Sequence, residues 1–142
     1  VRVTTPTLFY AGVIVPVIDL YADFRPNFAL IGPGLPATTT SVPLRFEPSW
    51  GAVVLREDPQ AARRSFYEPF GGKSYYQGPE LTMELQPGEY TLVYWCPSGQ
   101  TGDYVAIIGK REIWGAQDTV RALRVTPLIR RGEELHLNRK GR

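Results

Sequence analysis

The sequence predicts an all-β protein, an antiparallel β-sandwich of jelly-roll-like type with a short helical or irregular C-terminal extension. Long Val- and Ile-rich runs lack helical spacing, and residues 81–85 alternate between apolar and polar side chains. The 14 glycines and 13 prolines fall between the apolar runs, as in a fold of many short strands. A chain of 142 residues fits one core. We expect a β-domain over residues 1–115 and an extension with a basic tail over residues 116–142.

The first half of the chain contains three apolar runs. Residues 7–21 are interpreted as one or two strands, because Pro16 cannot donate to a ladder and marks an edge, a bulge or a break. Residues 28–31 form a strand that Gly-Pro-Gly closes. A loop rich in Thr and Pro then leads to another strand over residues 50–57.

A loop or a single helical turn is expected over residues 58–65. The segment SFYEPFGGKSYYQGPE that follows holds five aromatic residues, three glycines and two prolines. We interpret it as a corner of the fold, with a turn at Pro69 and Gly71-Gly72 and with Tyr75 at the start of the next strand. Its rings are expected to close one end of the core.

The clearest β-pattern lies over residues 81–109. Leu81, Met83 and Leu85 alternate with polar residues, as in a strand with one buried face. Pro87-Gly88 forms a turn, and the strands over residues 89–96 and 104–109 are expected to form a hairpin. Residues 115–125 are the helical candidate, which Pro127 ends.

The segment PGEYTLVYWCPSGQTGDYVAIIG resembles the final hairpin of pre-peptidase C-terminal (PPC)-type β-sandwiches, which are exported bacterial domains. The segments DFRPNFALIGPGLP and FYEPFGGKSYY resemble an uncharacterised group of exported bacterial proteins with the same ending. Cys96 departs from the acidic or small residue expected there. The resemblance implies an extracytoplasmic location, secreted, at the cell surface or in a periplasm-like space. The chain begins at Val1, so we expect a processed or excised product.

The charge is unevenly distributed along the chain. From Arg121 onward there are seven basic and two acidic residues, or +5, so the first 120 residues carry −3 of the net +2. The aromatic residues therefore lie in a mildly acidic region, and the basic residues gather in the tail. This separation argues against a nucleic-acid-binding surface, in which the two kinds of residue are interleaved.

Carbohydrate binding is the most specific ligand hypothesis, since exposed rings stack on sugars and amides or carboxylates bond to their hydroxyls. The residues that meet this description are Tyr67, Glu68, Tyr75, Tyr76, Gln77 and Trp50. Alternate strand residues face the core, so core packing is the competing interpretation for at least half of the rings. Among the rings that face outward, we expect Tyr76 before the others.

Metal and catalytic sites have weaker signals. Asp103 and then Asp23 are the best single calcium ligands, but no Asp-x-Asp spacing supports them. No His follows Cys96 in its loop, which argues against a copper site, and Cys96 is interpreted as a half-buried apolar residue. The single histidine, His136, lies in the basic tail, which argues against a nucleophilic triad.

Taken together, these patterns predict a non-catalytic structural or interaction module of the bacterial cell envelope or surface. It would act by protein–protein recognition or self-association, without an obligatory cofactor and with calcium as an alternative. Carbohydrate binding through exposed rings is the second hypothesis. No nucleic-acid partner is expected, and contact with a membrane would come only through an anchor or assembly outside this chain.

Overall fold

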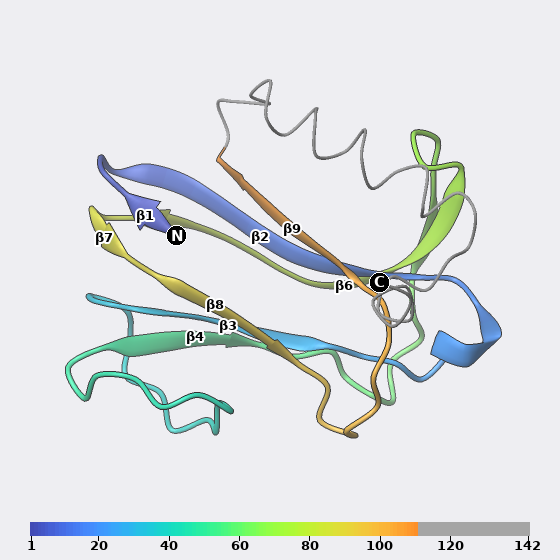
Figure 1. The fold of residues 1–142 in the computed structure, drawn as a ribbon, viewed down its shortest axis with the longest axis horizontal. Helices are drawn as coiled ribbons and strands as arrows, with labels where there is room; N and C mark the ends of the chain where they lie inside the picture. Colours follow the sequence, from blue (N-terminus) through green and yellow to red (C-terminus); the bar gives the residue numbers. More distant parts are fainter. Residues whose placement is uncertain (111–142) are drawn as a thin grey trace, which may run out of the picture.

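The computed structural model describes residues 1–110, and its strands form antiparallel sheets (Figure 1). One sheet has the strand order β5 (Ser65–Glu68), β6 (Lys73–Leu85), β2 (Thr7–Pro16), β9 (Val105–Lys110). The other has the order β4 (Gly51–Leu55), β3 (Asn27–Gly32), β8 (Thr91–Trp95). A two-stranded ribbon joins β1 (Arg2–Val3) to β7 (Gly88–Glu89). The prediction of an all-β antiparallel protein is confirmed over these residues.

The helical content of residues 1–110 is one short 3₁₀ turn, η1 (Asp19–Tyr21). Within this range no helix has the length and apolar character needed to cross a membrane. The predicted helix over residues 115–125 and the predicted boundary between residues 115 and 116 lie outside the described residues.

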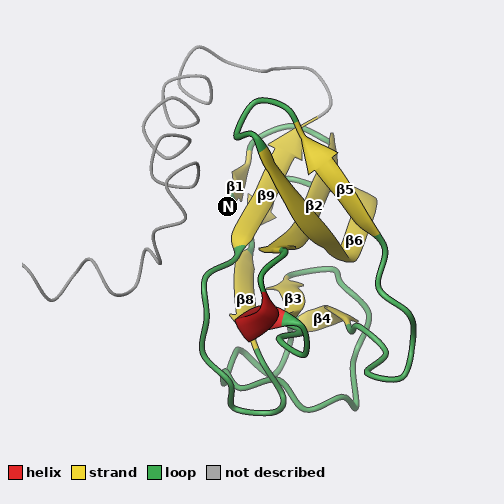
Figure 2. Ribbon diagram, turned by 90° about the vertical axis from the view of Figure 1, so that its right-hand side faces the viewer, coloured by secondary structure: helices red, strands yellow, loops and turns green. Residues whose placement is uncertain are grey.

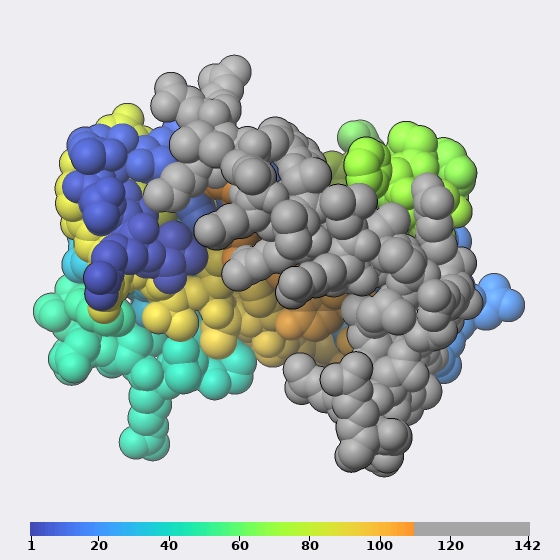
Figure 3. Space-filling model, turned by 45° about the horizontal axis from the view of Figure 1, so that its top comes forward, coloured from blue at the N-terminus to red at the C-terminus, as the bar shows by residue number. Residues whose placement is uncertain are grey.

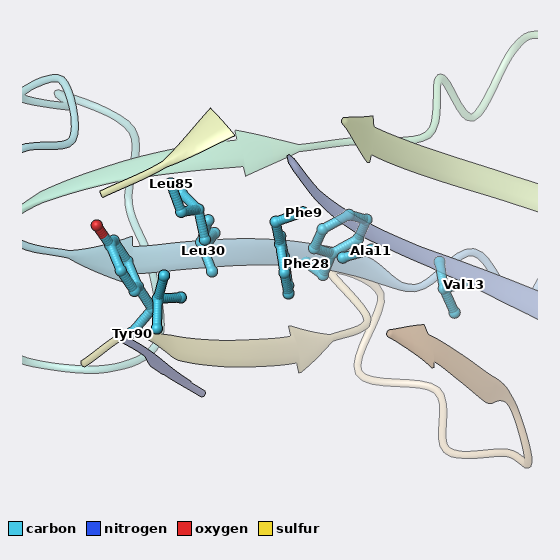
Figure 4. Packing of buried hydrophobic residues seen from close by; sticks show 8 residues of the cluster. Phe9, Ala11, Val13, Phe28, Leu30, Leu85 and Tyr90 are labelled. Carbon is cyan, nitrogen blue, oxygen red and sulfur yellow. The ribbon is translucent and has the colours of Figure 1, made fainter. Parts of the chain in front are cut away.

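The main core lies between the four-stranded and the three-stranded sheet, which occupy separate layers in Figure 2. Figure 4 shows side chains from both sheets in one cluster. Its buried members are Phe9, Ala11 and Val13 of β2, Phe28 and Leu30 of β3, Leu85 of β6, and Val3 and Tyr90. Because Leu85 is buried and Leu81 and Met83 pack against this cluster, the predicted inward face of residues 81–85 is confirmed.

Strand β3 is buried along its whole length. It lies between β4 and β8, and one face contributes to the main core. On its other face Ala29 and Ile31 form a second cluster, against which Val42 and Phe46 of the loop before β4 pack. Burial on both faces explains why this strand is continuously apolar in sequence instead of alternating.

The apolar run at residues 7–21 contains one strand, β2, which ends at Pro16. Strand β2 extends to Pro16, which pairs with Tyr75, and the Val17 N–H still bonds to the Ser74 carbonyl at 3.0 Å. The chain then turns, because the Ile18 N–H bonds back to the Pro16 carbonyl at 3.0 Å. The possibility of a second strand was therefore wrong, and η1 takes its place.

The two final strands do not form the expected hairpin. Strand β8 pairs with β3, whereas β9 pairs with β2 in the other sheet. The connecting loop is held across this gap by two contacts. The Asp103 N–H bonds to the Tyr21 hydroxyl at 3.0 Å, and Gln100 Nε2 bonds to the Leu20 carbonyl at 3.1 Å. Consecutive strands β8 and β9 thus enter different sheets, and η1 anchors the loop between them.

Candidate functional site

The β5–β6 hairpin carries the most exposed aromatic rings among the described residues. In this hairpin β5 pairs antiparallel with β6, which places Phe66 opposite Tyr75 and Tyr67 opposite Ser74. The Tyr67 residue is 64% exposed and Phe70 is 62% exposed, and Phe66 is exposed as well. Figure 3 shows this hairpin, in yellow-green, as a projection at one end of the molecule. We call these three aromatic residues the β5 edge surface.

Glu68 stabilises the hairpin turn by accepting hydrogen bonds from its backbone N–H groups. Its carboxylate accepts the Phe70 N–H at 2.6 Å and also the Gly71 N–H, while its carbonyl accepts the Gly72 N–H at 2.9 Å. Gly72 has a φ of +67°, a conformation that favours glycine. The predicted turn is confirmed, and both oxygens of the Glu68 carboxylate are engaged in building it.

The structure separates the rings proposed for ligand binding. Tyr75 is buried, and this burial, followed by the charge of Glu68, raises the pKa of its hydroxyl. Tyr76 packs against the core formed by Val15, Tyr21 and Phe24, and the Arg63 guanidinium lies 4.2 Å from the centre of its ring. Tyr76 is therefore partly buried, and the expectation that it faces outward before the other rings was wrong, since Tyr67 is the more exposed ring.

The remaining members of the predicted ligand set lie apart from one another. Gln77 is exposed on β6, where its N–H bonds to the Arg64 carbonyl at 2.9 Å. Trp50 packs against the outer face of the three-stranded sheet, next to Ala52, whereas Tyr67 belongs to the other sheet. Of the predicted rings, Tyr67 alone is strongly exposed, and Phe70, which was not in the set, is its equal. Sugar binding by this set stays a prediction.

A buried cluster of charged residues was missed in the sequence. The Glu57 carboxylate lies between two guanidinium groups: Arg63 Nε is 2.8 Å and Arg25 Nη1 is 3.0 Å from its Oε1. Arg63 Nη2 also bonds to Glu57 Oε2 at 3.3 Å, which makes that pair bidentate. The side chains of Arg63, Glu57 and Arg25 are 3%, 11% and 16% exposed.

This cluster fastens three segments of chain to one another. Arg63 Nη1 bonds to the Tyr21 carbonyl at 3.1 Å, and Arg25 Nη1 bonds to the Asp58 carbonyl at 2.9 Å. The Glu57 N–H bonds to the Oδ1 atom of buried Asn27 at 3.2 Å. Because its carboxylate is bonded to both guanidiniums, Glu57 holds these segments together and has a positioning role. Glu57 and Arg25 are 32 residues apart in sequence, and no local pattern links them.

Pockets lie next to this charged cluster. One, of about 500 Å³, is lined by Arg25, Glu57, Asp23, Trp95 and Cys96, among others. A second, of about 320 Å³, includes Arg56, Arg64 and Gln77 in its lining together with the charged cluster. Both belong to the end of the molecule at which the loop between β4 and β5 meets β6 or β8.

The residues proposed for calcium are not part of a recognisable metal centre. Asp23 is exposed and lines the larger pocket, and the Asp103 N–H bonds to the Tyr21 hydroxyl. Over residues 1–110 no group of three or more His, Cys, Asp or Glu side chains is placed to hold a metal ion. Calcium binding stays a prediction without a supporting ligand group in this range.

Cys96 lies at the junction of the loop and the core. It is partly buried against the cluster of Val15, Tyr21 and Phe24, and its Sγ is 3.2 Å from Ser98 Oγ. The interpretation of Cys96 as a half-buried apolar residue is confirmed.

Comparisons with known proteins add no assignment to this geometry. The chain matches no protein-family model, no curated protein and no solved structure.

Proposed function

We propose that this chain is a non-catalytic interaction module that assembles by pairing β5 with the same strand of a second copy. The observation that carries the proposal is a sheet edge bearing exposed aromatic side chains. Among the described strands β5 has a neighbour on one side only, namely β6. Its outer edge therefore presents backbone N–H and C=O groups to another strand.

The sequence of β5 is suited to pairing with itself. Two copies of β5 related by a two-fold axis pair antiparallel with one residue opposite its own copy, and a register centred on Tyr67 places the two Tyr67 rings opposite each other. Directly opposed residues share a face of the sheet, so the two Tyr67 rings form an aromatic pair on one face. Such an interface has two-fold symmetry and closes as a dimer.

The pairing is confined to a short edge, because β5 spans Ser65–Glu68 and Phe70 lies beyond its end. Because β5 has only four residues, we expect a weak dimer with a micromolar dissociation constant.

Two further parts of the proposal concern fold and location. We propose that the two sheets form a jelly-roll-like β-sandwich, supported by the cluster that both sheets share. We also propose that the module acts at the bacterial cell surface or envelope. This location is supported by the resemblance of residues 23–36 and 66–76 to exported bacterial proteins.

The experiment is analytical ultracentrifugation of the chain and two charged variants across a range of concentrations. Tyr67→Lys places a charge in the proposed interface, next to its own symmetry copy. We expect its dimer dissociation constant to rise about thirtyfold, as for a residue worth about 2 kcal/mol of binding. Leu20→Lys is the matched control, since Leu20 is 62% exposed on η1 and adds the same charge. A monomeric parent chain, or equal effects of the two variants, would count against edge pairing.

Carbohydrate binding is the second candidate, favoured by the strong exposure of Tyr67 and Phe70 on one hairpin. Exposed aromatic rings of this kind stack on sugar faces. A polysaccharide pull-down with Phe70→Ala separates the two candidates, because Phe70 lies outside β5. Loss of glycan binding in Phe70→Ala together with an unchanged dimer would favour the carbohydrate function.

A further inference from the structure

The smaller pocket beside the charged cluster has an excess of positive charge. Four arginines line it, namely Arg25, Arg56, Arg63 and Arg64, together with two carboxylates, those of Glu57 and Asp58. The formal charge of the lining is therefore +2. Part of this charge is buried with Arg63 and Arg25, where solvent screens it less than it would at the surface.

The guanidinium groups in this lining differ in what they are free to bind. Arg63 donates to Glu57 and to two carbonyls, and Arg25 donates to Glu57 and to the carbonyls of Asp58 and Ala61. Arg56 and Arg64 are exposed, and within the described part of the chain neither forms an ion pair or side-chain hydrogen bond. Their forks of N–H donors remain available to a ligand.

The carboxylates of the lining are already engaged. Glu57 is held by both buried arginines, and Asp58 Oδ1 accepts the Gln60 N–H at 2.8 Å. Neither contact includes Arg56 or Arg64. The positive charge of these two residues is consequently not matched by an ion pair within the pocket.

The backbone around the two free arginines is fixed in place. Arg56 precedes Glu57, whose N–H bonds to buried Asn27, and the Arg64 carbonyl accepts the Gln77 N–H at 2.9 Å. On the β6 side, the pocket wall contains a bulge at Gly78-Pro79, where the pairing of β2 with β6 changes register. Bulges of this kind re-aim side chains beside functional sites. The two arginines thus stand on a preorganised support.

From these observations we propose that the pocket binds a phosphate or sulfate group, with Arg56 and Arg64 as its direct ligands. A dianionic oxyanion matches the +2 lining, and the arginine fork matches its oxygen geometry. Arg25 and Arg63 hold the loop and contribute long-range attraction.

Isothermal titration calorimetry of the full chain at low ionic strength tests this site. The probes are inorganic phosphate, inorganic sulfate and glycerol 3-phosphate, with acetate as a monoanionic comparison. We expect saturable phosphate or sulfate binding that is tighter than acetate binding. Arg56→Gln and Arg64→Gln are each expected to weaken it about tenfold. Tighter binding of glycerol 3-phosphate than of inorganic phosphate would identify the natural group as a phosphate ester.

Two controls keep the interpretation specific. Arg45→Gln removes the same charge from an exposed arginine in a different loop and should leave the dissociation constant within about twofold of that of the parent. Tyr67→Lys alters the β5 edge and should also leave it unchanged. The proposal is overturned if none of the dianions binds saturably at millimolar concentration, or if Arg45→Gln weakens binding as much as Arg56→Gln does.

Discussion

Two tyrosines of the inner core differ in what their hydroxyl groups contact. The Tyr90 hydroxyl donates to the Gln86 carbonyl at 2.9 Å. The Tyr94 hydroxyl is buried and has no hydrogen-bond partner among residues 1–110, although its ring stacks on Phe28 with 5.4 Å between centroids. Burial, followed by the proximity of Tyr104, raises the pKa of Tyr94 to about 12. An unpaired buried hydroxyl costs free energy that a partner would offset.

Replacement by phenylalanine should therefore affect the two positions differently. Tyr94→Phe removes an unsatisfied group and is expected to leave stability unchanged or raise it by up to about 1 kcal/mol. Tyr90→Phe leaves the Gln86 carbonyl without its donor and should cost about 1 kcal/mol. Urea denaturation of both variants measures the difference. A loss in Tyr94→Phe as large as in Tyr90→Phe would show that the Tyr94 hydroxyl has a partner.

Within the charged cluster, replacement of Glu57 should lower the unfolding free energy most. Glu57→Gln leaves two guanidiniums that are 3% and 16% exposed without a counter-ion. We expect a decrease in unfolding free energy of about 3 kcal/mol, because an uncompensated buried charge is costly. Glu47→Gln, at an exposed loop carboxylate, is the control and should change stability by less than about 0.5 kcal/mol. Similar values for the two variants in urea denaturation would refute the structural role of Glu57.

Among the elements, strand β6 contains the most constrained glycine position next to a candidate site. Gly78 lies in the bulge, where a Cβ atom would come within 2.6 Å of the Val13 carbonyl oxygen and 2.8 Å of Val13 Cγ1. Gly109 lies on β9 of the same sheet, with no described atom within 4 Å of an added Cβ. The two glycines therefore provide a matched comparison.

Gly78→Ala should destabilise the protein by about 2 kcal/mol, because the β2 backbone must move to admit the methyl group. Gly109→Ala should be neutral or stabilising by about 0.5 kcal/mol, since alanine lowers the entropy of the unfolded chain. Thermal and urea unfolding of the two variants provide the measurement. A tolerated Gly78→Ala would mean that the bulge can open, and the support for Arg64 would then be less rigid than inferred.

At the level of elements, the strands could be predicted from sequence and their partners could not. Alternation at residues 81–85 specifies a strand with one buried face, and the turn chemistry at Gly71-Gly72 specifies a reversal. Residues 105–110 pair with β2 and not with the preceding β8, and the loop before them contacts η1, so their placement rests on segments distant in sequence. The Arg25–Glu57–Arg63 cluster is likewise formed by folding from separated segments, so spacing rules cannot find it.

For the whole molecule, stability should fall at alkaline pH. Burial, followed by the Glu80 contact, raises the pKa of Tyr10 to about 12, and burial also raises the pKa of Tyr94 to about 12. The unfolded value is 10.0, so the folded state disfavours ionisation of both groups. Their contribution is complete below pH 10 and is lost as the pH rises from 10 to about 12.

Urea denaturation at pH values across this range should show a steady decrease in unfolding free energy. Tyrosinate absorbance should show ionisation of the shifted groups delayed toward pH 12 in the folded chain. Tyr94→Phe should make the decrease in stability shallower, since one shifted group is removed. A flat stability profile from pH 10 to about pH 12 would contradict these assignments.

The central claim is that β5 pairs with β5 of a second copy, and hydrogen exchange tests it most directly. The β5 amides that do not bond to β6 should exchange rapidly in dilute solution and become protected as concentration rises. The Leu20 amide on η1 should exchange at the same rate in both samples. Concentration-dependent protection of residues 65–68, absent in Tyr67→Lys, is the predicted result. A dimer that forms without added protection of these residues would contradict the account.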